Sequence, residues 1–270
     1  MSMMSSVMER EVYPSAPVVL VALEVRHPGV DPMGAAAIAR AKKILAGVTP
    51  LQEPQTISGI TITPAGPPTQ TVETAQRFSS RDRSTAVTFR SSAVVVETTR
   101  YGQYEDLREV IELALQAREA AGAVDGVLRV GLRYIDEIRV PGEDGLLGWA
   151  EWVDRSLLGP GPLAAEHGLS AAQWQGLAVF DGTAGAQLVL RYGPGEGYAV
   201  DPGGELRRPA PAPGPFFLMD IDNFWVPDPV PNFDVPALLQ RCDDLHKPVR
   251  ALFESLITEK LRKEVLRHVG

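Results

Sequence analysis

The chain has 270 residues, of which 44% are hydrophobic and 22% charged, and this composition is typical of a folded globular protein with a sizeable core. A formal net charge of −8 gives no support to a general electrostatic grip on nucleic-acid phosphates. The single cysteine, Cys242, excludes a disulfide framework within one chain and fits a reducing cytosol.

The N-terminal stretch lacks the basic and apolar regions of a secretory signal, so no such signal is expected. Residues 1–9 are expected to form a mobile tail. No stretch approaches the roughly 20 consecutive apolar residues that a membrane span needs. We therefore expect a cytoplasmic protein without membrane association, in which residues 10–270 form a single α+β domain.

The first half of the chain predicts strands followed by a helix. Residues 17–26 (PVVLVALEVR) are apolar at both alternating sets of positions, which is typical of a central strand covered on both faces. Asp31 is a good N-cap for a first helix, and residues 51–69 are rich in turn formers, with a short strand at 60–63. Three strands are then expected at 70–79, 84–90 and 93–99, and an amphipathic helix at 103–120.

The segment VLRVGLRYIDEIRV, residues 127–140, has the strongest strand chemistry in the chain. It fits either a strand buried on both faces or a long strand at a sheet edge. Gly131 predicts a bulge or a close backbone approach. Arg133, Asp136, Glu137 and Arg139 follow it, and a solvated face or a local ion-pair network is favoured over a catalytic cluster.

The second half predicts a short helix at 146–158 and a hairpin around Asp181-Gly182. The Pro- and Gly-rich residues 201–215 predict an extended surface loop. A strand at 216–224 and a helical region at 235–268 complete the chain, and Pro248 should kink or divide that helix.

This order favours an α+β fold in which long helices lie on one face of a curved, mostly antiparallel sheet. Residues 70–120 and 173–257 could be two copies of one unit, in which antiparallel strands lead into a long helix. The corresponding halves of the chain would be 10–145 and 146–270.

Several segments resemble a sporadically distributed bacterial family of uncharacterised proteins of similar length. They are YPSAPVVLVALEVR at 13–26, YGQY at 101–104, VGLRYID at 130–136, FFLMDIDNF at 216–224 and DLHKPVRALFESLITEKLR at 244–262. The resemblance implies a bacterial protein without an established activity, and the patchy distribution suits a mobile-element or defence-linked complex. The long loop at 201–215 departs from the pattern.

The motif MDID places Asp220 and Asp222 on one face of a strand. Such a pair can hold Mg²⁺ or Mn²⁺ for phosphodiester cleavage, and Asp136 or Glu137 could complete the site if the two strands are neighbours. The favoured alternative is structural, with both carboxylates capping backbone amides or pairing with Arg133 and Arg191.

His246 could act as a general base, but a helix-packing role is favoured. Zinc-ligand spacings and other cofactor motifs do not occur, so no cofactor is expected. Aromatic residues that could form a partner-docking ledge, or alternatively close the open face of the sheet, are Trp149, Trp152, Trp174, Phe224 and Trp225, and Arg133 is a further candidate for binding.

Because the sequence contains no complete catalytic constellation, the first hypothesis is a non-enzymatic binding or scaffold protein with a protein partner or a homo-oligomeric state. The second is a metal-dependent phosphodiesterase or nuclease that uses Asp220 and Asp222.

Overall fold

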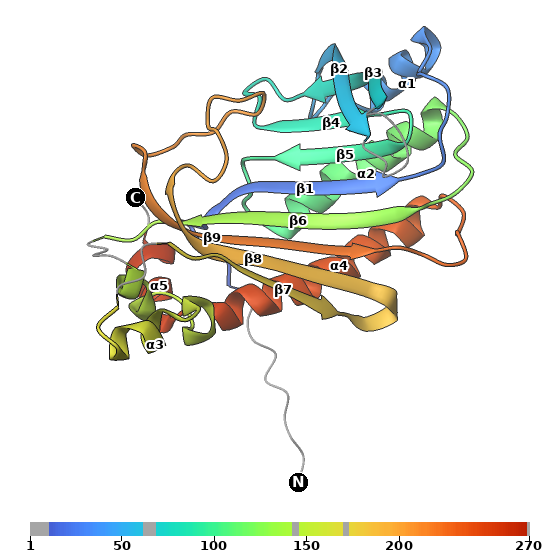
Figure 1. Cartoon of the computed structure of the whole chain (residues 1–270). Coiled ribbons are helices and arrows are strands. Elements are labelled where there is room, and N and C mark those ends of the chain that lie inside the picture. The colour runs from blue at the N-terminus through green and yellow to red at the C-terminus, as the bar shows by residue number, and fades with distance from the viewer. Residues whose placement is uncertain (1–10, 62–68, 142–145, 170–172, 269–270) are drawn as a thin grey trace.

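The computed structural model describes residues 11–61, 69–141, 146–169 and 173–268. These residues form an α+β fold with one open, antiparallel, nine-stranded sheet, in the order β2-β3-β4-β5-β1-β6-β9-β8-β7 (Figure 1). The predicted fold class is confirmed. The predicted tail at 1–9 lies outside the described residues.

The first half of the chain supplies five strands and two helices. The elements are β1 Val18–Arg26, α1 Ala35–Leu45, β2 Leu51–Thr61, β3 Thr69–Ser79, β4 Thr85–Phe89, β5 Ala93–Thr98 and α2 Tyr104–Ala121. The second half supplies β6 Arg129–Ile138, α3 Gly161–Glu166, β7 Gly176–Asp181, β8 Ala186–Gly197, β9 Gly214–Trp225, α4 Val235–Leu256 and α5 Glu259–Leu261. Short 3-10 helices cover Leu146–Glu151, Arg155–Leu158 and Thr183–Gly185, and a π-helical turn covers Arg262–Leu266.

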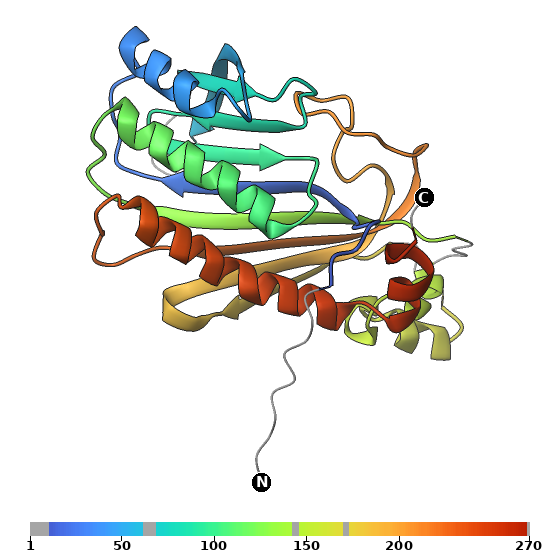
Figure 2. The same ribbon diagram turned by 180° about the vertical axis from the view of Figure 1, so that it is seen from behind.

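Helices α1, α2 and α4 lie on one face of the sheet, as predicted (Figure 2). We call this side the helix face and the other side the open face. The strands bury every second residue against the helices, and β1 shows the pattern plainly, since Val19, Val21, Leu23 and Val25 are buried. A single cluster of buried apolar residues includes Phe78 from the first half and Phe217 from the second.

A similar order of elements occurs twice in the sheet, with four strands in the first meander and three in the second. In the first half β1 pairs with β5, the last strand of a meander that leads into α2. In the second half β6 pairs with β9, the last strand of a meander that leads into α4. Because β1 and β6 are antiparallel neighbours at the centre, the repeated order begins again at β6, earlier than residue 146.

Several local predictions need correction. Residues 51–61 form a full strand instead of turns, because β2 is an edge strand and tolerates Pro54. Gly34, not Asp31, is the N-cap of α1. Helix α4 runs through Pro248 and ends at Leu256, so the proline does not divide it. Strand β8 continues through the Gly-rich segment 193–197, which pairs with β9.

Candidate functional site

The acidic pair of β9 lies on the open face. Asp220 and Asp222 alternate with Phe217, Met219 and Ile221, which are fully buried on the helix face, so the predicted position of the two carboxylates on one face of the strand is confirmed. Asp220 accepts two hydrogen bonds from Arg133, at 2.6 and 2.7 Å, and lies 3.5 Å from an Arg191 nitrogen. This paired geometry is the structural alternative that the sequence favoured.

Asp222, like Asp220, lies beside arginine side chains on the open face, and together these residues form a row of alternating charges that we call the charge ladder. An Arg129 nitrogen lies 3.3 Å from its carboxylate and a second one lies 3.2 Å from Glu24 on β1. Burial nevertheless raises the pKa of Asp222, because desolvation outweighs the attraction of the neighbouring guanidinium groups. The charge ladder therefore crosses β1, β6, β9 and β8, and each of its carboxylates lies beside an arginine.

The other two acidic candidates lie on opposite faces of β6. The strands β6 and β9 are neighbours, as the nuclease hypothesis required, but strand alternation turns Asp136 to the helix face, away from Asp220. Glu137 is on the open face, where Arg139 and Arg208 donate to it at 2.9 Å and the Ala199 amide at 2.8 Å. Glu137 thus fixes the loop of residues 198–213 over the sheet.

The expected aromatic ledge is only partly at the surface. Trp149 and Trp152 are 1% and 4% exposed, so neither belongs to a partner-docking ledge. Trp149 packs on Phe217 in the core, because the 3-10 helix that carries it folds against the end of the sheet. Phe224 and Trp225 are half-buried under guanidinium groups, Arg129 lying 4.6 Å and Arg241 4.1 Å from the ring centroids.

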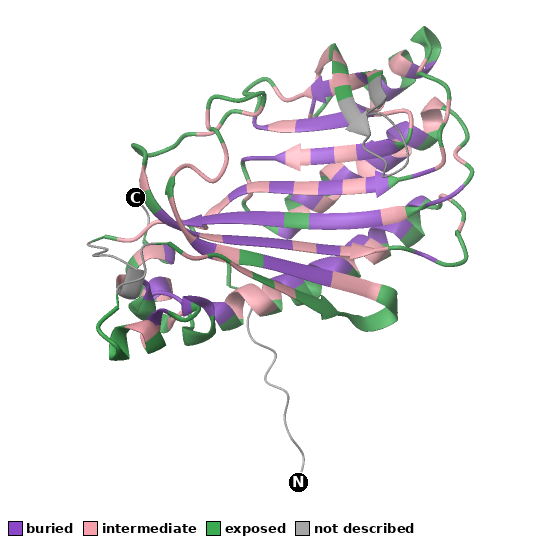
Figure 3. Cartoon of the chain, in the orientation of Figure 1, coloured by how far each residue is buried: buried purple, intermediate pink, exposed green. Residues whose placement is uncertain are grey.

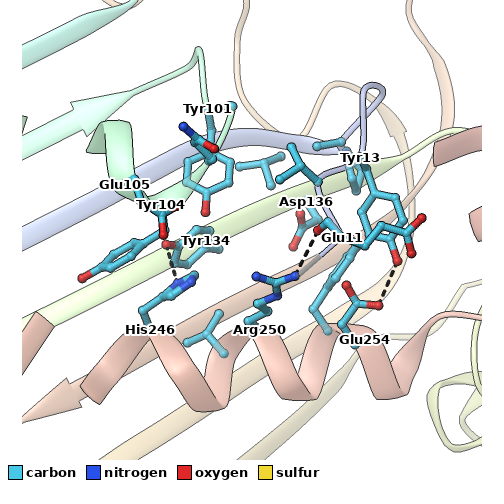
Figure 4. Close-up of a pocket in the computed structure, with 18 residues that line it drawn as sticks. Glu11, Tyr13, Tyr101, Tyr104, Glu105, Tyr134, Asp136, His246, Arg250 and Glu254 are labelled. Atoms are coloured by element: carbon cyan, nitrogen blue, oxygen red, sulfur yellow. Dashed lines mark hydrogen bonds between the residues drawn. The ribbon is translucent and has the colours of Figure 1, made fainter. Parts of the chain in front are cut away.

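The helix face contains a pocket of about 100 Å³ (Figure 4). Its walls come from β6, the start of α2, the middle of α4 and the segment of residues 11–18, which we call the strap. Segments far apart in the sequence meet there. The strap supplies Tyr13, YGQY supplies Tyr101 and Tyr104, YID supplies Tyr134 and Asp136, and α4 supplies His246.

An aromatic cluster forms one side of the pocket. The ring of His246 stacks on Tyr104, with centroids 3.9 Å apart, and its Nδ1 lies 3.0 Å from the Tyr134 hydroxyl. Tyr101 meets Tyr134 edge to face at 5.4 Å. The Tyr104 hydroxyl donates to Asp243 at 2.9 Å. His246 therefore packs between helix and sheet, as expected.

Asp136 is the exceptional group in the pocket. It is 2% exposed, and its Oδ1 has no hydrogen-bond partner. Burial raises the pKa of Asp136 from 3.8 to about 8, and the negative charge of Asp220 across the sheet adds to the shift. A carboxyl group without a counter-charge is thus held at the wall of a pocket.

The strap closes one side of this pocket and is held by polar contacts. The Tyr13 hydroxyl donates to Glu254 at 2.9 Å, and Arg250 donates to the Glu11 carbonyl at 3.0 Å. Farther along, the Ser15 amide donates to the Leu266 carbonyl at 3.1 Å. These contacts join the strap to α4 and to the end of the described chain.

Sequence reasoning missed the pocket although a signal was present. From the sequence, Arg133, Asp136, Glu137 and Arg139 are interpreted as one group. Within β6, Arg133 and Glu137 occupy odd positions, whereas Asp136 shares the even positions with Tyr134 and Ile138. That alternation places one carboxyl group on an apolar face. Its pocket partners are distant in the sequence and could not be assigned.

Across the described residues, no group of three or more His, Cys, Asp or Glu side chains is arranged to hold a metal ion. None of the described helices is both long and apolar enough to cross a bilayer. Comparison with protein-family models gives no match to the chain, and comparison with curated proteins gives none either. The fold and sites define an α+β protein with a helix-covered sheet, one open face and a small acidic pocket.

Proposed function

We propose that the protein is a non-enzymatic binding or scaffold protein, and that it docks an extended segment of a protein partner along the edge strand β7. The observation that carries this proposal is the exposure of Leu177, Val179 and Phe180, whose exposed fractions are 66%, 54% and 45%. Figure 3 shows the tip of the hairpin formed by β7 and β8 as an exposed region at the border of the sheet.

The two edges of the sheet differ in how they resist pairing. The edge strand β2 carries Pro54 and the exposed Glu53, and both features discourage a further strand. On β7 the single charged residue is Asp181, at the end of the strand, and within the described chain no strand covers its outer side. An unpaired apolar edge can add a strand from another chain through backbone hydrogen bonds.

The competing hypothesis, a metal-dependent phosphodiesterase, has less support. Both carboxylates of the proposed metal pair lie beside guanidinium groups, and a metal ion would have to displace Arg133 from the buried Asp220. Burial raises the pKa of Cys242 to about 12, which suits a packing role for this thiol.

Two further parts of the proposal rest on sequence. The reducing bacterial cytoplasm is supported by the single buried cysteine and by the resemblance to a bacterial family. Membership of a mobile-element or defence-linked complex is supported by that resemblance alone.

The docking proposal is tested with Val179→Lys and a matched control, Val72→Lys, on the distant strand β3, where the valine is 64% exposed. The protein is purified alone and after co-expression with the products of the adjacent genes. Light scattering measures the assembly state and hydrogen exchange measures protection of the β7 amides. We expect β7 to be protected in a dimer or a complex, and Val179→Lys, but not Val72→Lys, to abolish the assembly.

An exposed β7 in every assembly that forms would contradict the proposal. So would an assembly that survives Val179→Lys unchanged. Either outcome would move the search for a partner to the open face of the sheet.

A further inference from the structure

The pocket under the strap presents a charge imbalance. Four carboxyl groups line it, on Glu11, Glu105, Asp136 and Glu254, whereas Arg250 is the only permanently charged cation among its described lining residues. Glu11 and Glu254 pair with Arg267 and Arg262. Arg250 donates to a backbone carbonyl of the strap. Asp136 is buried and is left with an unpartnered oxygen.

We propose that this pocket binds a small alkylammonium ion, with Asp136 as the counter-ion of its ammonium group and the surrounding tyrosines and apolar side chains as the site of its alkyl part. Burying an ionised carboxylate is strongly unfavourable unless a cation pairs with it. An ammonium group supplies both the charge and the N–H donors that the free Oδ1 of Asp136 lacks.

The lining residues suit the rest of such an ion. Tyr13, Tyr101, Tyr104 and Tyr134 enclose the site in Figure 4, and aromatic side chains attract cations through the negative potential of their ring faces. Val249 and Phe253 add apolar surface from α4. A carboxylate combined with several aromatic rings recognises ammonium ions in preference to anions.

The volume limits the size of the ligand. A buried cavity of about 150 Å³ accommodates benzene, which has about six heavy atoms. By that measure the 100 Å³ of this pocket hold about four heavy atoms. Propylammonium and butylammonium are therefore the expected size, whereas a ligand as large as an aromatic amine would have to displace the strap.

The proposal is tested by titrating the full chain with butylammonium at about pH 9, where Asp136 is ionised and alkylamines keep their proton. Differential scanning fluorimetry and calorimetry give the stabilisation and the affinity. Potassium chloride at equal ionic strength and butanol at equal concentration are the controls. We expect a saturable rise in melting temperature with butylammonium and none with either control.

Two variants locate the site. Asp136→Asn should weaken binding by roughly tenfold or more, because the charge-assisted contact is lost. Asp222→Asn, the same substitution on the open face, should bind like the wild-type protein. A wild-type protein that shows no saturable response, or a response that Asp136→Asn leaves unchanged, would overturn the proposal.

A measurement on the wild-type protein gives an independent test. Carbon NMR of the Asp136 carboxyl group reports its pKa, which a bound cation should lower because it stabilises the carboxylate. An unchanged pKa at saturating butylammonium would overturn the assignment. A low pKa in the ligand-free protein would also overturn it, because Arg250 would then be the counter-ion.

Discussion

Replacing Asp136 by Asn should stabilise the ligand-free protein, and the gain should grow as the pH rises. In the unfolded chain this carboxyl group loses its proton near pH 4, whereas the folded protein holds it until about pH 8. Between these values the folded state binds one proton more than the unfolded state. The free energy of unfolding therefore falls as the pH rises. An asparagine has nearly the same shape and does not titrate.

The size of the effect follows from the interval between the two pKa values. The unfolded chain releases this proton roughly 3 pH units below pH 7, whereas the folded protein still holds it at pH 7. Each of these pH units lowers the free energy of unfolding by about 1.4 kcal/mol. This sets an upper limit of about 4 kcal/mol on the destabilisation by Asp136. We expect Asp136→Asn to raise the free energy of unfolding at pH 7 by about 2–4 kcal/mol. The gain can fall below the upper limit because the new amide group also needs hydrogen-bond partners.

The assay is urea denaturation of the wild-type protein and Asp136→Asn at intervals from pH 5 to pH 9, with Asp222→Asn as the matched control. Other titratable or charged groups near Asp136 are present in both proteins, so their effects largely cancel in the difference. They are Glu11, Tyr13, Tyr101, Tyr104, Glu105, Tyr134, Asp220, His246, Arg250 and Glu254. The difference in the free energy of unfolding between Asp136→Asn and the wild-type protein should widen by about 2–4 kcal/mol between pH 5 and pH 8. A gap that is independent of pH, or a destabilised variant, would refute the reasoning.

Two further outcomes test the open face and the sheet. Asp220→Asn should lower the free energy of unfolding by about 1–3 kcal/mol through loss of buried charge-assisted hydrogen bonds. Mn²⁺ should leave the melting temperature of the wild-type protein unchanged. A clear rise in melting temperature with Mn²⁺ that the variant loses would instead support the nuclease hypothesis. Gly176→Ala should cost about 1–3 kcal/mol in urea denaturation, because a Cβ there would collide with the ring of Tyr192. Gly47→Ala, where a Cβ meets nothing within 4 Å, is the control that should be tolerated.

The sequence was sufficient where the controlling interactions are local. Side chains on a strand alternate, so the opposite directions of Asp220 and Met219 follow from the sequence alone. The amphipathic stripe of α2 and the hairpin of β7 and β8 are equally local signals. These features account for the correct fold class.

The sequence-based predictions were wrong where tertiary contacts, not local sequence, determine the structure. Pro54 marks a turn in most contexts, yet it is accommodated at the edge of this sheet, where an amide hydrogen bond is not required. Trp149 was a candidate for a partner-docking ledge, but its ring fills the core beside Phe217. The pocket joins Tyr13, Asp136 and His246, residues too distant in the chain for any local pattern to connect.

The two faces of β6 are electrostatically coupled, and this coupling leads to a last prediction. Asp220 lies on the open face, but its negative charge raises the pKa of Asp136 on the helix face. Asp220→Asn removes that charge and leaves Arg133 without its carboxylate partner, so both changes favour ionisation of Asp136. Carbon NMR should find a lower pKa for Asp136 in Asp220→Asn than in the wild-type protein, and the variant should bind butylammonium more tightly at pH 7. If the pKa of Asp136 stays the same, burial alone sets it, and events on the open face do not reach the pocket.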